Sequence, residues 1–126
     1  MYLLDINTII YYLQAALPEK AMQQLNIIVD EQPLVSVITK IELLGFNTAT
    51  IEEQAITETF INSSFVFNLD EAVIKQTIDL RKQYRIKLPD AIIAATAIVY
   101  NLTLVTRNIS DFDKIPVLKC QDPNIL

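Results

Sequence analysis

The chain has 126 residues, of which 52% are hydrophobic and 20% charged, with a net charge of −5 at pH 7. It has no histidine and one glycine, which excludes a histidine general base, a Ser-His-Asp or Cys-His nucleophile, a histidine-ligated zinc site, a P-loop and a GxGxxG dinucleotide motif. No linker-like stretch divides the chain, so we expect a single domain over residues 1–126. One cysteine allows no intramolecular disulfide, which fits the reducing cytoplasm as its expected location.

The first part of the chain alternates short apolar runs with helical spacing, which is typical of strands followed by helices. Asp5 falls at the first predicted turn from strand to helix. The predicted elements are a strand at 2–4, a helix capped by Asn7 or Thr8 and reaching about residue 16, a helix opened by Pro18 and ended by Pro33, a strand at 34–36, and a helix ending near Gly45.

The helix that precedes Gly45 carries a predicted buried stripe, with Glu42 at its edge. That stripe consists of Val37, Ile38, Ile41 and Leu44.

The second part of the chain continues the same alternation. An amphipathic helix is predicted first, with Ile51, Ala55, Ile56 and Phe60 on its apolar face. It is followed by a strand at 65–69, a helix from an Asp70 cap to about 84, and a helix restarted by Pro89. The last predicted elements are a strand at 103–106, a turn or short helix at 107–113 and an edge strand at 117–119. The longest nearly apolar run, residues 91–100, is far shorter than the roughly 20 residues of a membrane-spanning helix. We therefore predict an α/β fold with a mostly parallel sheet flanked by helices, and no membrane partner.

Four acidic residues lie in otherwise apolar segments: Asp5, Glu42, Asp90 and Asp111. Each has an ordinary structural explanation, as a helix cap, a helix-edge charge, a partner of a helix dipole and a turn former, respectively. Several carboxylates close together would repel one another, however, and a cation makes such an arrangement tolerable. Because ligands bind beyond the carboxyl ends of parallel strands, we expect the fold to gather these acids at that edge.

Carboxylates acting with water favour a hard divalent cation such as Mg²⁺ or Mn²⁺. Such ions usually act on phosphates, and a pair of them can promote hydrolysis of a phosphodiester without histidine. The residues therefore favour metal-assisted phosphodiester hydrolysis. Cys120 has no base to activate it and is interpreted as a packing residue.

The sequence pI of about 4.6 argues against broad electrostatic attraction of nucleic acid, so a polyanionic substrate would need local basic residues. An alternative is that the basic residues before Asp90 lie in the last turn of a helix, where positive charges interact favourably with the helix dipole. The candidate substrate-binding rim consists of Lys40, Arg81, Lys82, Arg85, Lys87 and Arg107.

Four segments, in order, carry a family resemblance: YLLDINTII, VITKIELLG, LPDAIIAATA and LVTRNISDF. Together they resemble the motifs of the PIN-domain ribonucleases, and most closely those of the VapC-type toxins of bacterial toxin–antitoxin pairs. The resemblance implies a PIN fold in which Asp5, Glu42 and Asp90 are catalytic metal ligands. Asp111 is the implied fourth acid, although some relatives carry an acid where this chain has Asn108. Asn7, Thr106 and Asn108 would orient water or carboxylates around the metal.

The same resemblance implies Mg²⁺- or Mn²⁺-dependent endonucleolytic cleavage of RNA. A cognate VapB-like antitoxin would wrap the toxin and cover its site, and the protein would form a homodimer. One alternative is a non-catalytic PIN-like binding module. Another is a phosphoacceptor receiver domain, which is disfavoured because Asp5 is the only strand-end acid in the first half and no suitably placed lysine follows a late strand.

Overall fold

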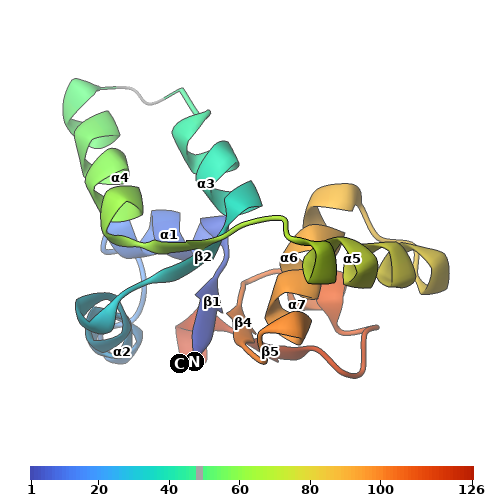
Figure 1. The fold of residues 1–126 in the computed structure, drawn as a ribbon. Coiled ribbons are helices and arrows are strands. Elements are labelled where there is room, and N and C mark those ends of the chain that lie inside the picture. The colour runs from blue at the N-terminus through green and yellow to red at the C-terminus, as the bar shows by residue number, and fades with distance from the viewer. Residues whose placement is uncertain (48–49) are drawn as a thin grey trace.

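The computed structural model describes residues 1–47 and 50–126 and contains one five-stranded sheet (Figure 1). All neighbouring strands are parallel, and their order is β3-β2-β1-β4-β5. The strands are β1 (Tyr2–Leu4), β2 (Leu34–Ser36), β3 (Phe65–Phe67), β4 (Thr103–Val105) and β5 (Lys119–Gln121). The predicted α/β fold with a parallel sheet is confirmed. Because the order reverses between β1 and β4, the crevice beyond their carboxyl ends is the expected ligand site of such a sheet.

The helices that connect these strands follow the predicted alternation. They are α1 (Ile6–Leu13), α2 (Glu19–Glu31), α3 (Val37–Leu44), α4 (Ile51–Ser63), α5 (Glu71–Gln83), α6 (Leu88–Val99) and α7 (Ile109–Phe112), followed by the 3-10 helix η1 (Pro123–Ile125). The predicted cap of α5 is confirmed, since the Asp70 carboxylate accepts a hydrogen bond of 2.9 Å from the Val73 backbone N–H. No helix in the described parts of the chain is both long and apolar enough to cross a membrane.

The cap of α1 is Asp5, as the structural explanation of that acid allowed, rather than Asn7 or Thr8. Its carboxylate accepts a 2.9 Å hydrogen bond from the Ile6 backbone N–H, so the helix begins immediately after β1. The Thr8 hydroxyl instead donates to the Val105 carbonyl at 2.9 Å and ties α1 to β4.

Alternate residues of the central strands enter two hydrophobic clusters. Leu3, Leu34 and Leu104 pack with α5 and α6, whereas Leu4, Val35 and Val105 pack with α1, α2 and the base of α4. This period of two follows from the pleat of a strand, which points successive side chains to opposite faces. The sheet is therefore covered by helices on both faces (Figure 1).

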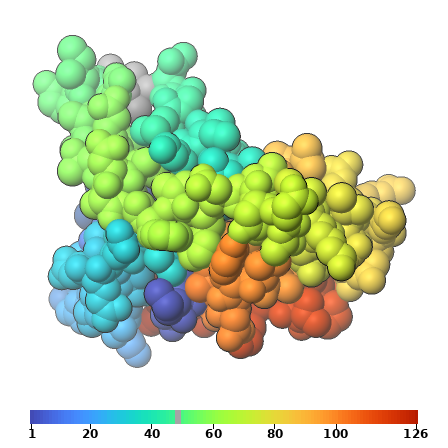
Figure 2. All heavy atoms as spheres, in the orientation of Figure 1, coloured from blue at the N-terminus to red at the C-terminus, as the bar shows by residue number. Residues whose placement is uncertain are grey.

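The predicted buried stripe of α3 is only partly correct, since Val37 and Ile38 are half-buried and Ile38 packs against the core, but the rest of the stripe is exposed. Ile41 is 61% exposed and Leu44 is 43% exposed, while the buried positions of α3 are Thr39 and Leu43. Figures 1 and 2 show that α3 and α4 form an arm that protrudes from the body, so their outward faces have no sheet to pack against. In α4, likewise, only Phe60 and Ile61 at its end are buried.

Three predicted strand boundaries also differ. The strand predicted at 103–106 ends at Val105. The last strand is Lys119–Gln121 rather than 117–119, because Lys119 pairs with Thr103 and Cys120 pairs with Leu104. That register leaves Val117 outside the sheet and 69% exposed, and it packs the half-buried Cys120 against the core, as its interpretation as a packing residue requires. The strand predicted at 65–69 ends at Phe67, where its pairing with Ser36 ends.

Candidate active site

Asp5 lies immediately beyond β1, at the point where the strand order reverses. Its side chain is only 5% exposed, and its backbone N–H donates to the Val105 carbonyl at 3.1 Å. The Thr106 hydroxyl donates to the second carboxylate oxygen, Oδ2, at 2.8 Å, and the Asn108 backbone N–H donates to that hydroxyl at 3.1 Å. Because Ile6 holds the other oxygen, Oδ1, the orientation of the Asp5 carboxylate is fixed from both sides.

Burial raises the pKa of Asp5 above its usual 3.8, although the hydrogen bonds from Thr106 and Ile6 act in the opposite direction. The negative charge of Asp111, on α7, raises the pKa further. The Asp5 carboxylate is therefore buried at the carboxyl edge of the sheet in a fixed orientation near Asp111, where its ionisation is unfavourable.

The other acids approach the same edge from helices. Desolvation raises the pKa of Glu42 from 4.5, and the charges of Asp5 and Asp90 raise it further. Asp90 lies in the first turn of α6, after Pro89, where desolvation first and then Asp5 and Asp111 raise its pKa from 3.8. The four acids predicted from the sequence thus act electrostatically on one another, although they come from four separate parts of the chain.

The donor chemistry of these acids suits a hard divalent cation, because the available side-chain ligands are carboxylate oxygens. Among residues 1–47 and 50–126, no three His, Cys, Asp or Glu side chains are grouped closely enough to hold a metal ion. The acids therefore border a common region without converging on one point, a separation that repulsion between like charges favours. The residues thus fit a cation in their donor chemistry.

The three polar residues predicted to surround the acids occupy different positions. Thr106 is fully buried and contacts Asp5 directly. Asn108 contacts Thr106 through its backbone N–H, while its side chain is exposed. Asn7 is half-buried in the first turn of α1, two residues after Asp5.

The residues of the predicted basic rim are all exposed, but they do not share one environment. Arg81 and Lys82 lie in the last turn of α5, as the alternative interpretation predicted. The Arg107 guanidinium lies over the Tyr11 ring, 4.5 Å from its centroid, a cation–π contact beside the site. Lys87 caps α6, and its charge acts on Asp90 to lower the pKa of that carboxyl.

Lys114 is a cation near the site that the sequence analysis missed. Its charge also lowers the pKa of Asp90, and its ammonium group donates a hydrogen bond to the Arg85 carbonyl. Its place three residues after Asp111 was a signal that could have identified it.

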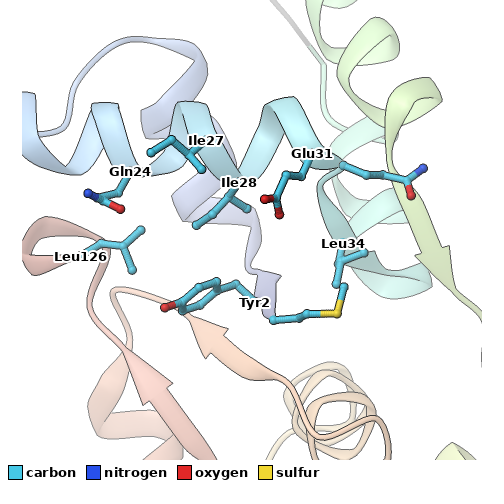
Figure 3. A pocket seen from close by; sticks show the side chains of 9 residues that line it. Tyr2, Gln24, Ile27, Ile28, Glu31, Leu34 and Leu126 are labelled. Carbon is cyan, nitrogen blue, oxygen red and sulfur yellow. The ribbon is translucent and has the colours of Figure 1, made fainter.

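A hollow of about 520 Å³ lies at the opposite edge of the sheet, between α2 and the amino-terminal ends of β1 and β2 (Figure 3). Its labelled lining includes Tyr2, Ile28, Leu34 and Leu126, with Glu31 as its one acidic side chain. A single carboxylate among apolar side chains does not make a cation site, so the carboxyl edge of the sheet is the candidate active site.

Comparisons with known proteins identify the family of the chain. The sequence model of the PIN domain family matches residues 2–118, a range that contains all four acids. No curated protein matches the chain significantly.

Several solved structures resemble the chain over nearly its whole length. The structure of DNA-bound VapBC from Salmonella typhimurium matches with a TM-score of 0.80 and 28% identity, covering 97% of each chain. VapBC2 from Rickettsia felis, bound to a DNA fragment from its promoter, matches with a TM-score of 0.78 and 25% identity, covering 95% of this chain and 96% of that one. A toxin–antitoxin complex from Klebsiella pneumoniae matches with a TM-score of 0.75 and 28% identity, covering 98% of each. The chain therefore belongs to the PIN domain family, and its predicted resemblance to the VapC-type toxins is confirmed.

Proposed function

We propose that this protein is a divalent-cation-dependent endoribonuclease that acts as the toxin of a toxin–antitoxin pair. The observation that carries the proposal is that Asp5, held by Ile6 and Thr106, lies at the strand-order reversal with other acids close enough for their charges to interact. Acids whose pKa values are raised by burial and by neighbouring acids, and which lie at a strand-order reversal, are typical of a functional site.

In this proposal Asp5, Glu42, Asp90 and Asp111 hold Mg²⁺ or Mn²⁺. When bound, the cation supplies charge neutralisation and a reactive water at the RNA phosphodiester. The protein contributes orientation: Ile6 and Thr106 hold the two oxygens of Asp5, and the Asn108 N–H holds Thr106. The side chains of Asn7 and Asn108 are proposed to orient water around this set.

The direct test is cleavage of a mixed RNA pool by the purified protein with Mg²⁺, with Mn²⁺ or with EDTA. The proposal predicts discrete fragments with either metal and none with EDTA. Fragments that persist in EDTA would contradict metal dependence. No cleavage of the pool, nor of structured or single-stranded RNAs added separately, would favour the non-catalytic PIN-like binding module.

We also propose that the basic rim binds the RNA backbone. Reversing the charge at Arg81 and Arg85 together is expected to lower kcat/KM for RNA about tenfold or more at low salt, because local basic charge raises the encounter rate with a polyanion. The loss should shrink as salt is added, since exposed charges are then screened. Unchanged cleavage at low salt would refute this role of Arg81 and Arg85.

The arm offers a candidate surface for the antitoxin. A groove of about 370 Å³ lies between α1, α3 and α4, and most of its exposed lining is apolar. Its apolar lining residues are Ile10, Leu13, Leu43, Phe46 and Ile56. Because α3 also carries Glu42, a segment bound here would lie beside the proposed site. We propose that an apolar segment of a VapB-like antitoxin occupies this groove.

Replacing Phe46 and Ile56 with alanine is expected to weaken antitoxin binding about tenfold or more, since large apolar anchors dominate such interfaces. Both side chains are more than half exposed, so the fold should persist. The measurement is calorimetry with the protein encoded by the adjacent reading frame, and Val117→Ala is the matched exposed control. Equal affinity in the double variant would place the antitoxin elsewhere.

The resemblance also leads us to propose a homodimer and a cytoplasmic location. The dimer is checked by sedimentation of the purified chain over a range of concentrations.

A further inference from the structure

The hydroxyl of Thr39 stands apart from those of the other buried threonines. Thr39 is fully buried, and its Oγ1 is the one buried side-chain polar atom without a hydrogen-bond partner in the described parts of the chain. Thr77 and Thr96, which are also buried in helices, donate to the carbonyl four residues earlier at 2.7 and 2.8 Å. An unpaired buried hydroxyl is unfavourable, so its retention requires a reason.

The position of Thr39 explains why it lacks that partner. It is the third residue of α3, whose cap is Ser36, so the residue four earlier is Val35 in strand β2. The Val35 carbonyl belongs to a strand and does not lie over the first turn of the helix. Thr39 therefore does not form the hydrogen bond to the carbonyl four residues earlier that Thr77 and Thr96 form. The hydroxyl must find its partner elsewhere.

The face of α3 that carries Thr39 also carries Glu42, because residues three apart are neighbours on a helix. Ile38 packs against the cluster under α6, and Leu43 belongs to the cluster under α1. At 100° per residue, Thr39 and Glu42 fall between these two directions. Asp5, immediately beyond β1, is close enough for its charge to act on Glu42.

We propose that Thr39 is a positioning residue for Glu42, whose carboxylate accepts a hydrogen bond from the Thr39 hydroxyl when Glu42 turns inward to hold a divalent cation. The inference rests on the proposed function. Thr106 already serves Asp5 in this way, with its hydroxyl on one carboxylate oxygen at 2.8 Å. Glu42 is exposed on the same helix and has three side-chain torsions with which to turn. The hydroxyl is thus unfavourable in the metal-free protein and satisfied in the loaded one.

Two measurements on Thr39→Val, which keeps the shape and removes the hydroxyl, have opposite expected signs. In EDTA the variant should raise the Tm by about 2–4 °C, because an unpaired polar atom is replaced by a methyl group. In a calorimetric titration with Mn²⁺ it should bind about tenfold more weakly or worse, as expected when a partner of a metal ligand is lost. Thr39→Ser, which retains the hydroxyl, should bind Mn²⁺ within about twofold of the wild type.

Thr77→Val is the matched control, since it removes a buried helical hydroxyl that is already paired. It should leave Mn²⁺ affinity unchanged and should not raise the Tm. Mn²⁺ affinity of Thr39→Val equal to that of the wild type would overturn this inference and leave the proposed function intact. A lower Tm of Thr39→Val in EDTA, or equally weak binding by Thr39→Ser, would overturn it too. A wild type that does not bind Mn²⁺ would overturn both proposals.

Discussion

Replacing Asp5 with asparagine is expected to lower metal-dependent RNA cleavage about a thousandfold. Asp5 is the most buried of the four acids and the one whose two oxygens are both held by hydrogen bonds. Loss of a charged ligand that contributes about 4 kcal/mol of charge stabilisation corresponds to roughly that change in rate. The measurement is single-turnover cleavage of one defined RNA at saturating Mg²⁺.

The same substitution should make the metal-free protein more stable, which separates a lost ligand from a damaged fold. Asparagine caps helices as well as aspartate does, and it removes a buried charge whose ionisation is unfavourable. An increase of about 3 °C or more in Tm in EDTA is expected. Asp79→Asn, at an exposed position of α5, is the control and should change neither quantity. A destabilised Asp5→Asn, or one that cleaves RNA like the wild type, would refute the assigned role.

The second large effect is a reversal of the pH dependence of stability by Mg²⁺. The pKa values of Asp5, Glu42 and Asp90 are raised in the folded chain. In the unfolded chain these acids have pKa values near 3.8 and 4.5, and in the folded chain their pKa values are higher. At a pH between the two, the folded state binds more protons than the unfolded state, so the free energy of unfolding falls as pH rises. Metal-free protein should therefore be more stable near the lower end of this window than at pH 8.

Mg²⁺ is expected to act in the opposite direction, because it binds the ionised carboxylates and competes with protons. At about 100 times its Kd it would add about 2.7 kcal/mol at pH 8, and progressively less as pH falls. The check is chemical denaturation from pH 4.5 to 8 with EDTA or Mg²⁺. Asp5→Asn should flatten both profiles, and identical profiles with and without Mg²⁺ would count against a shared cation site.

Asp70 provides an internal reference for this experiment. Its pKa is lowered by the hydrogen bond from Tyr100 and by the Val73 N–H, so its contribution to stability is lost only as pH falls below 3.8. The slope above pH 4.5 can therefore be assigned to the acids with raised pKa values.

The fold was predictable wherever local signals and burial agreed. Asp70 is a strong helix cap before an amphipathic helix, and α5 follows from it. The arm was not predictable in the same way, because apolar spacing gives no information about whether a sheet lies opposite. The spacing of Ile41 and Leu44 in the sequence therefore fits a buried stripe, although both side chains are exposed in the structure. The last strand shifted because its register depends on pairing with β4, a contact distant in sequence.

The sequence predicts which acids are candidates for the site but not the contacts that they make. Acids within apolar segments identified Asp5, Glu42, Asp90 and Asp111, and the structure brings their charges within reach of one another. The sequence offered Asp5, Asn7 and Thr8 as caps of α1 but could not choose among them, since the choice depends on how directly the helix follows β1. Nor did it identify Lys114 or the unpaired hydroxyl of Thr39, which depend on packing between helices.

The central claim is that the four acids form one divalent-cation site, and calorimetric titration of the metal-free protein with Mn²⁺ tests it most directly. Wild type and Asp79→Asn are expected to bind saturably, and Asp5→Asn is expected to show no saturable binding under the same conditions. No binding by the wild type, or unchanged binding by Asp5→Asn, would contradict the claim.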